Sequence, residues 1–380
     1  MNTLSITTPT KNSPQLNLER SETPTRTIPF SVDGFERTSP RLRTFEPVPF
    51  VTPRLYSVVQ SEKDSAATPV LRGAHSAELN AYPAIKAAVQ IDEQANLQTG
   101  NKTTFVPATA TPAKGIVVGL HGWSAGTWQF EHLATQLADQ GYHVYVPRLP
   151  GHGVVDDNGD PTSRDFPRNN ELGRYTEFAD KVYSDAASLG LPVHTLGLSG
   201  GGAIALDLAG RHEVASAMLY DPFLSPGDAT ADTLMTVFKW LDVLTFGVAS
   251  LLLRLLPVVF EGPKKDIAKW GRHGHVNFNA AQIFTLTHYG RQAIQNAKNT
   301  STPIQIIGTD FEPGVVSRQR LKDVVSTGDH RGLYTFDKDS NVPHAMIHWR
   351  EFENDEARTQ VRALTFDFIE SSEVHSNQRS

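Results

Sequence analysis

One serine in the chain stands in the setting that a catalytic nucleophile requires. Residues 197–201 read Gly-Leu-Ser-Gly-Gly and follow a strand that is expected at 194–196. A helix is expected to begin directly afterwards, at 202–210. In such a turn the hydroxyl of Ser199 is exposed at the tip, and glycines on either side avoid collisions within a strained backbone. The pattern indicates nucleophilic catalysis by Ser199, with a helix N-terminus directed at the developing negative charge.

A histidine near the end of the chain is the expected general base for this serine. His344 follows the strand predicted at 333–336 in a short loop, from which its imidazole can reach Ser199 and accept the hydroxyl proton. His348 lies further along, but the run His-Ala-Met-Ile-His lacks the glutamate of the metalloprotease zinc motif. We therefore expect His348 to have a packing role.

A second loop supplies candidates for an oxyanion site. The strand predicted at 115–120 is followed by His121-Gly-Trp-Ser124, whose flexible backbone can bring an N–H group toward the nucleophile. The N–H of Trp123, together with the N–H of Gly200 after the nucleophile, would bind the oxyanion of a tetrahedral intermediate. His121 is expected to anchor this loop rather than to act as a base.

These candidates need a scaffold that gathers distant loops, and the chain shows alternating strand and helix patterns that imply a mostly parallel sheet. The expected strands are 115–120, 143–146, 194–196, 215–220, 303–307 and 333–336. The expected helices are 76–94, 128–140, 177–189, 202–210 and 355–369. Because the carboxyl ends of parallel strands share one edge of a sheet, their loops can form a common site.

A long insertion, 224–302, interrupts this alternation and contains the most apolar stretch of the chain, 234–260. A membrane span needs roughly 20 predominantly apolar residues. Lys239, Asp242 and Arg254 interrupt this stretch, so we expect amphipathic helices that form a cap over the site. Peripheral contact of the cap with a lipid surface is a possible additional role.

The N-terminal part of the chain has a different composition. Residues 1–70 are rich in Pro, Ser and Thr and show no helical or strand period, which predicts a disordered tail. The tail could also serve as a docking arm, for a partner that the sequence does not identify. One catalytic domain, 71–380, then contains the expected elements and the insertion. The first residues lack a basic and an apolar region, so a signal peptide is not expected and a cytoplasmic location is favoured.

Composition excludes several other classes of function. The chain has 380 residues, no cysteine, and a net charge of −6 from 35 basic and 41 acidic side chains, so thiol chemistry is excluded and no nucleic-acid partner is expected. His152, His273 and His275 lack a further clustered ligand at suitable spacing, so no metal is expected. The proposed chemistry implies no cofactor.

Four motifs together resemble the monoacylglycerol lipase and carboxylesterase branch of the α/β-hydrolases. They are Gly119–Trp123, Val146–Gly153, Gly197–Gly201 and Val342–Met346, and the likeness covers approximately residues 76–370. The resemblance implies an α/β-hydrolase fold, in which helices flank a mostly parallel central sheet and a helical cap is inserted. It also implies a serine esterase with the triad order Ser, acid, His that acts on acylglycerols or related carboxylic esters.

The resemblance also guides the choice of the triad acid. In the family the acid is followed by a small loop and then by Val, and in Gly308–Val315 this register falls on Glu312. The usual residue there is Asp, so Asp310 in the same loop is the alternative. Asp221, after the strand predicted at 215–220, is a remoter candidate, because a few relatives of the fold place the acid there. Capping of the following turn is the ordinary role for Asp221.

The sequence therefore predicts a serine hydrolase that cleaves esters of largely apolar acyl groups, because the cap is rich in Leu, Val and Phe. A thioesterase or an amidase would use the same triad. A non-catalytic receptor for an apolar ligand could keep the same fold, but the complete Ser, acid and His set favours an enzyme.

Overall fold

The structure, a computed structural model, describes residues 78–169, 171–260, 274–310, 315–328 and 330–377. Contacts divide the chain into Met1–Val58 and Val59–Ser380, and all described residues belong to the second unit. The predicted tail over residues 1–70 lies outside the described residues, as do Glu312 and His273.

Strands and helices alternate along the described chain, as the sequence predicts. The strands are β1 (Thr104–Val106), β2 (Gly115–Leu120), β3 (Tyr142–Val146), β4 (Val193–Leu198), β5 (Ser216–Tyr220), β6 (Pro257–Val259), β7 (Asn277–Asn279), β8 (Ile304–Thr309) and β9 (Arg331–Phe336). The helices are α1 (Pro83–Gln94), α2 (Glu131–Asp139), α3 (Leu172–Ala187), α4 (Gly200–Arg211), α5 (Ala229–Leu244), α6 (Val248–Leu253), α8 (Ala280–Asn296), α9 (Arg318–Val325) and α10 (Asp355–Asn377).

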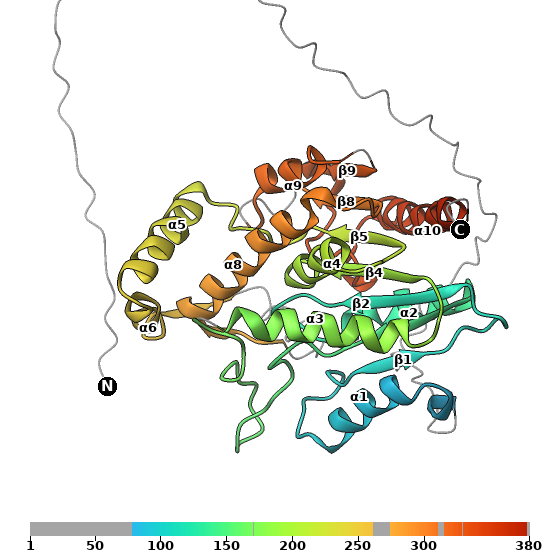
Figure 1. The fold of residues 1–380 in the computed structure, drawn as a ribbon, viewed down its shortest axis with the longest axis horizontal. Helices are drawn as coiled ribbons and strands as arrows, with labels where there is room; N and C mark the ends of the chain where they lie inside the picture. Colours follow the sequence, from blue (N-terminus) through green and yellow to red (C-terminus); the bar gives the residue numbers. More distant parts are fainter. Residues whose placement is uncertain (1–77, 170, 261–273, 311–314, 329, 378–380) are drawn as a thin grey trace, which may run out of the picture. The chain divides into compact units, whose positions relative to one another are not determined.

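A seven-stranded sheet carries the fold, with the strand order β1-β3-β2-β4-β5-β8-β9 (Figure 1). All neighbours pair in parallel except β1, which runs antiparallel to β3 at one edge. The carboxyl ends of β4, β5, β8 and β9 therefore lie along the same edge of the sheet. The predicted α/β-hydrolase fold is confirmed, since helices flank a mostly parallel sheet and α5 and α6 are inserted between β5 and β8.

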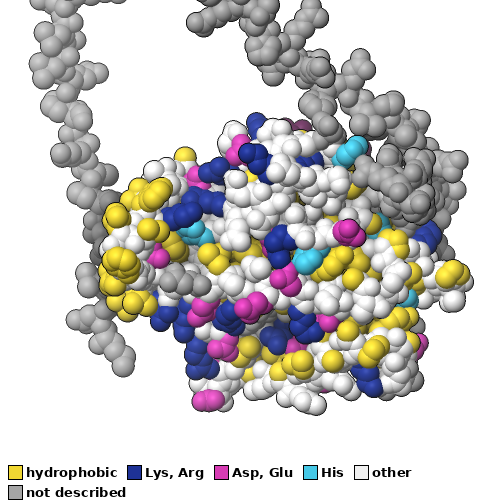
Figure 2. Space-filling model, in the orientation of Figure 1, with side chains coloured by type: hydrophobic (Ala, Val, Ile, Leu, Met, Phe, Trp, Pro, Cys, Tyr) yellow, Lys and Arg dark blue, Asp and Glu magenta, His cyan; other side chains and the backbone are white. Residues whose placement is uncertain are grey.

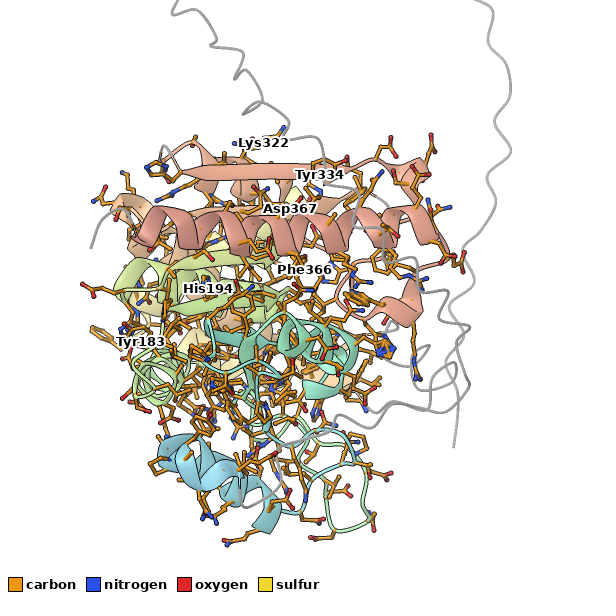
Figure 3. All side chains as sticks on the ribbon, turned by 90° about the vertical axis from the view of Figure 1, so that its right-hand side faces the viewer. Tyr183, His194, Lys322, Tyr334, Phe366 and Asp367 are labelled. Atoms are coloured by element: carbon orange, nitrogen blue, oxygen red, sulfur yellow. The ribbon has the colours of Figure 1, made fainter. Side chains whose placement is uncertain are left out.

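The two faces of the sheet bury separate hydrophobic clusters. Residues of α1, α3, α4 and α8 pack on one face, where Ile116 and Val118 of β2 point. Val117 points to the other face, which α2 and α10 cover. Figure 3 views the molecule from the side of α10, where Phe366 packs against this second cluster. Every residue of β2 and β4 is buried, as expected for parallel strands covered on both faces.

Local signals explain where several helices begin. Pro83 occupies the first turn of α1, where its missing N–H has no helical partner to lose. The side chain of Asp228 caps α5 by accepting from the backbone N–H of Ala231. α8 begins with a capping box, in which Asn279 and Gln282 each accept a backbone N–H of the other. This helix lies within the predicted insertion 224–302, but it packs on α3 and α4.

The cap exposes most of its apolar side chains. No residue of α5 is buried, and among the described residues the exposed large hydrophobic side chains, except Ile91, Val315 and Tyr334, lie between Leu234 and Val259. Figure 2 shows them gathered over α5 and α6, and we call this surface the apolar cap face. Within the described part of the chain, no helix combines the length and the apolarity that crossing a bilayer requires.

A buried ion pair joins α1 to the segment after β3. The guanidinium of Arg148 donates two hydrogen bonds to one carboxylate oxygen of Asp92, at 2.9 and 2.7 Å, and a third to the carbonyl of His152. The other oxygen of Asp92 accepts from the backbone N–H of Thr103. Because the Asp92 side chain is only 4% exposed, removal of its partner would leave a buried charge.

We predict that Arg148→Gln lowers the free energy of unfolding by about 3 kcal/mol, because the Asp92 carboxylate loses its partner in a buried position. Denaturant unfolding measures the change. Arg174→Gln is the matched control, since its pair with Glu171 is 43% and 39% exposed and such pairs contribute about 1 kcal/mol or less. Equal losses in the two variants would contradict the structural role of the buried pair.

Candidate active site

The nucleophile candidate occupies a strained turn between β4 and α4. Ser199 has φ 53° and ψ −116°, a backbone conformation that side-chain-bearing residues rarely adopt. A Cβ at Gly197 would collide with the carbonyl group of Gly201, and a Cβ at Gly201 would collide with the carbonyl oxygens of Leu120 and His121. The turn therefore requires glycine at both positions, as the sequence predicts, and strained residues of this kind are found most often at functional sites.

Backbone hydrogen bonds tie this turn to the end of β5. The N–H of Ser199 donates to the carbonyl of Tyr220 at 2.9 Å, and the carbonyl of Ser199 accepts from the N–H of Phe223 at 2.8 Å. Asp221 lies between these two partners in the chain. The structure therefore places the Ser199 turn beside the segment that carries Asp221.

Asp221 contacts the candidate base directly. The Nδ1 atom of His344 lies 2.8 Å from a carboxylate oxygen of Asp221, and this carboxylate is fully buried while the His344 side chain is 17% exposed. The pairing orients the imidazole and stabilises its protonated form. Three loops, after β4, β5 and β9, thus bring Ser199, Asp221 and His344 to one edge of the sheet.

Of the two carboxylates that the sequence favours as the acid, the structure describes only Asp310. Asp310 follows β8, but its side chain is 53% exposed and pairs with Nε of Arg318 at 2.9 Å. Glu312 lies outside the described residues. Arg318 also donates to the second carboxylate oxygen of Asp221, so one guanidinium bridges Asp221 and Asp310. Among the described carboxylates, Asp221, the remoter candidate of the sequence, is thus one that contacts His344.

The predicted oxyanion donors come from two adjacent segments. A Cβ added to Gly200 would lie 2.6 Å from the Cβ of Trp123, so the two backbones approach closely. The indole N–H of Trp123 donates to the hydroxyl of Tyr175 at 2.8 Å, and its rings stack on Phe278 of β7 with centroids 4.3 Å apart. The amide N–H of Gly122 donates to the side chain of Gln129. The loop is thus held by both the core and the cap.

Three buried histidines, which we call the histidine cluster, support this loop. His121 contacts the carbonyl of Gly122, and His152 contacts the carbonyl of Trp123. The Nε2 atom of His275, which precedes β7, accepts from the backbone N–H of Gly153 at 2.9 Å, and the backbone N–H of His275 donates to the carbonyl of Ser124. The predicted anchoring role of His121 agrees with these contacts.

Burial keeps the histidine cluster neutral. Loss of solvent lowers the pKa of His121 to about 3 and the pKa of His275 to about 4. Burial, followed by the proximity of the other two imidazoles, lowers the pKa of His152 well below its ordinary value. Among the described residues, no group of three or more His, Asp or Glu side chains is arranged to hold a metal ion.

His348, four residues after His344, occupies a buried packing position. It is 4% exposed, lies edge-on to Trp128 with ring centroids 4.9 Å apart, and contacts the carboxylate of Glu351 through Nδ1 at 2.8 Å. The structure thus gives it the packing position that the sequence suggests.

The chain belongs to the alpha/beta hydrolase family, whose family model matches residues 117–352. The predicted resemblance is thereby confirmed at the level of the family. Among curated proteins, none matches the chain in sequence.

Solved structures of lipases and esterases share the fold. A monoglyceride lipase from Saccharomyces cerevisiae is 16% identical with a TM-score of 0.52, and the similarity covers 71% of this chain and 89% of the yeast protein. The monoacylglycerol lipase of Paleococcus ferrophilus is 16% identical with a TM-score of 0.52, and the similarity covers 70% of this chain and 98% of that protein. A carboxyl esterase from Bacillus coagulans is 18% identical with a TM-score of 0.51, and the similarity covers 72% of this chain and 94% of the esterase. At these identities the similarity establishes the fold alone.

We predict that the histidine cluster makes the protein acid-sensitive. Below pH 6.5 the unfolded chain protonates His275, whereas the folded chain keeps it neutral down to a pKa of about 4. The free energy of unfolding should therefore fall by about 1.4 kcal/mol per pH unit from this residue as the pH drops through that window. Denaturant unfolding at several pH values should show that the free energy of unfolding falls less steeply with decreasing pH in His275→Gln. The glutamine side chain can still accept the hydrogen bond from the backbone N–H of Gly153. Parallel curves for the two proteins would contradict the buried neutral imidazole.

Proposed function

We propose that this protein is a serine hydrolase that cleaves carboxylic esters of apolar acyl groups, with Ser199 as nucleophile, His344 as general base and Asp221 as the triad acid. The observation that carries the proposal is the hydrogen bond between His344 and the buried carboxylate of Asp221, next to the strained Ser199 turn. A buried carboxylate that orients an imidazole close to a serine hydroxyl is the arrangement that activates a serine.

The reaction follows from these groups in two halves. His344 accepts the hydroxyl proton while Ser199 attacks the ester carbonyl, and the tetrahedral oxyanion is bound by the N–H groups of Trp123 and Gly200. The imidazolium, stabilised by Asp221, then protonates the leaving alcohol. Water, deprotonated by His344, attacks the acyl-enzyme, and collapse of the second tetrahedral intermediate releases the acid and regenerates Ser199.

Support for Asp221 over Asp310 comes from charge and position. The Asp221 carboxylate is buried and is bound on one oxygen by Arg318 and on the other by His344, so its charge is compensated without losing the contact to the base. Asp310 is half exposed and is directed to Arg318. Within the proposal, Glu312 remains the alternative acid.

Neighbouring chemistries share the triad. A thioesterase or an amidase would differ in the leaving group alone, and turnover of matched ester, thioester and amide substrates separates them. The cap favours apolar acyl groups, because Phe260 and Phe278 pack against Trp123 beside the proposed oxyanion site. A receptor that binds an apolar ligand without turnover is the remaining alternative.

We predict that a fluorophosphonate probe labels the wild-type protein and does not label Ser199→Ala. Asp221→Asn should slow ester turnover by about 10⁴-fold, because the imidazole loses the partner that sets its tautomer and stabilises its charge. Asp310→Asn and Glu312→Gln are matched controls that should retain most of the activity. If the probe does not label the wild-type protein, the receptor is the better interpretation. If Glu312→Gln loses about 10⁴-fold in ester turnover while Asp221→Asn stays active, the triad acid is Glu312.

We further propose that the apolar cap face contacts a lipid surface, where apolar esters reside. Phe246 is 97% exposed and Leu244 is 72% exposed at the end of α5, and an apolar helical surface flanked by cationic side chains is suited to the membrane interface. Lys239 and Arg254 lie within the same segment of the chain.

We predict that Leu244→Ser/Phe246→Ser weakens binding to phosphatidylcholine vesicles at least about tenfold, since each large apolar side chain contributes about 1.5–3 kcal/mol when it leaves water. Vesicle sedimentation measures the effect. Tyr334→Ser is the control, because Tyr334 is an exposed apolar residue on β9, outside the cap. Unchanged binding in the cap variant would contradict the lipid contact.

A further inference from the structure

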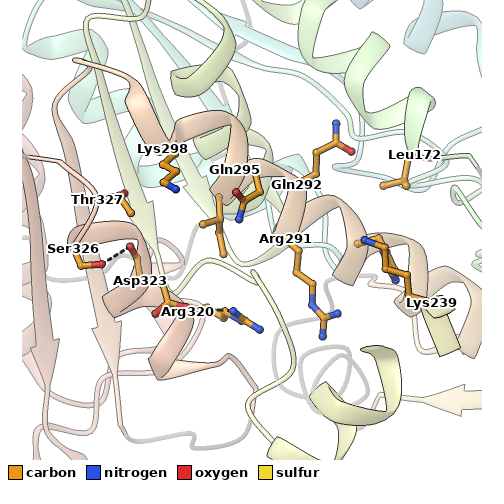
Figure 4. Close-up of a pocket in the computed structure, with 12 residues that line it drawn as sticks. Leu172, Lys239, Arg291, Gln292, Gln295, Lys298, Arg320, Asp323, Ser326 and Thr327 are labelled. Atoms are coloured by element: carbon orange, nitrogen blue, oxygen red, sulfur yellow. Dashed lines mark hydrogen bonds and ion pairs between the residues drawn. The ribbon is translucent and has the colours of Figure 1, made fainter. Parts of the chain in front are cut away.

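A cavity with a strongly cationic lining lies between the cap helix α5, helix α8 and helix α9 (Figure 4). Its volume is about 750 Å³. Its charged lining residues are Lys239 from α5, Arg291 from α8, Lys298 from the short 3₁₀ helix Ala297–Asn299, and Arg320 and Asp323 from α9. We call it the basic cavity. None of its lining residues belongs to the proposed triad or to the oxyanion loop.

Only part of this positive charge is compensated. Arg291 and Arg320 share the carboxylate of Asp232, at 2.6 and 3.5 Å, and Arg320 also pairs with Asp323 at 3.3 Å. Lys239 and Lys298 form no ion pair or side-chain hydrogen bond within the described residues. The four cations thus face two carboxylates, which leaves an excess positive charge around a space large enough for a ligand.

A buried polar atom in the lining also lacks a partner. His288 of α8 lines the basic cavity, and its Nε2 atom is buried without a hydrogen-bond partner among the described residues. Burial, then the nearby cations Lys239 and Arg291, lowers the pKa of His288 to about 4, so the imidazole is neutral at pH 7. Because this imidazole is neutral, the positive charge of the lining comes from the lysines and arginines alone.

We propose that the basic cavity binds a phosphate group. Two lysines without partners and two partly compensated arginines suit a compact anion with several acceptor oxygens, and Arg is the residue type that binds phosphate in a bidentate manner. Cationic side chains from three helices, α5, α8 and α9, can therefore contact the same phosphate group.

The position of the basic cavity suggests two sources for this phosphate. Lys239 comes from α5, the helix that also carries part of the apolar cap face. A phospholipid headgroup could therefore enter the cavity while the apolar cap face contacts the acyl chains. A small phosphorylated molecule in solution would present the same group.

The experiment measures phosphate binding by the full-length protein in two arms. Isothermal titration with sodium phosphate at constant ionic strength tests the free anion. Vesicle sedimentation compares phosphatidylglycerol with phosphatidylcholine, and thus tests the headgroup. The variant Lys239→Gln/Lys298→Gln removes the two unpaired cations. The control Lys322→Gln/Lys338→Gln removes the same charge at two exposed lysines outside the cavity.

We expect the cavity variant to weaken binding roughly tenfold or more in at least one arm, since each cation near an anionic surface contributes about 1 kcal/mol. The control should bind like the wild type. Saturable phosphate binding that the cavity variant loses identifies a site for free phosphate, and a cavity-dependent preference for phosphatidylglycerol identifies a headgroup site. The absence of both effects, or equal losses in the control, would overturn the proposal. Thermal unfolding of all variants checks that they remain folded.

Discussion

The hydrogen bond between Asp221 and His344 is the interaction on which the proposed chemistry depends. A fully buried carboxylate is costly unless it is paired and hydrogen-bonded, and Asp221 meets this condition through His344 on one oxygen and Arg318 on the other. The sheet supplies the geometry, because β4, β5 and β9 all end at the same edge. The strained turn at residue 199 is joined to the same place by hydrogen bonds to Tyr220 and Phe223. The nucleophile and its base thus share one rigid support.

The oxyanion loop depends on a second set of constraints. Its carbonyls are held by neutral, buried imidazoles, and the ring of Trp123 packs between the core and residues of the cap. Arg148 extends this support to α1, because it pairs with Asp92 and donates to the carbonyl of His152. The loop is therefore preorganised by contacts made with distant parts of the chain, which is the condition for effective stabilisation of a developing charge.

The sequence predicts much of this arrangement, because its strongest signals are local. Glycines around Ser199 and the alternation of buried strands with helices reveal the nucleophile turn and the sheet, and a histidine after the last strand indicates the base. The acid is harder to predict, since carboxylates after β5 and β8 both lie at the same edge. The choice between Asp221 and Asp310 depends on Arg318, which begins the eight-residue helix α9. A helix of this length is short for recognition from sequence and is not among the predicted elements, so the direction of its first side chain is not predicted either. The short edge strand β1 is missed for the same reason.

The chemistry depends on the hold of Asp221 on the imidazole of His344, and proton NMR of the full-length protein tests this contact most directly. An imidazole N–H that donates to a buried carboxylate gives a strongly downfield resonance, which should be present in the wild type and absent in His344→Gln. We expect Asp221→Asn to shift or remove this resonance and Glu312→Gln to leave it in place. A resonance that survives in Asp221→Asn and disappears in Glu312→Gln would contradict the account.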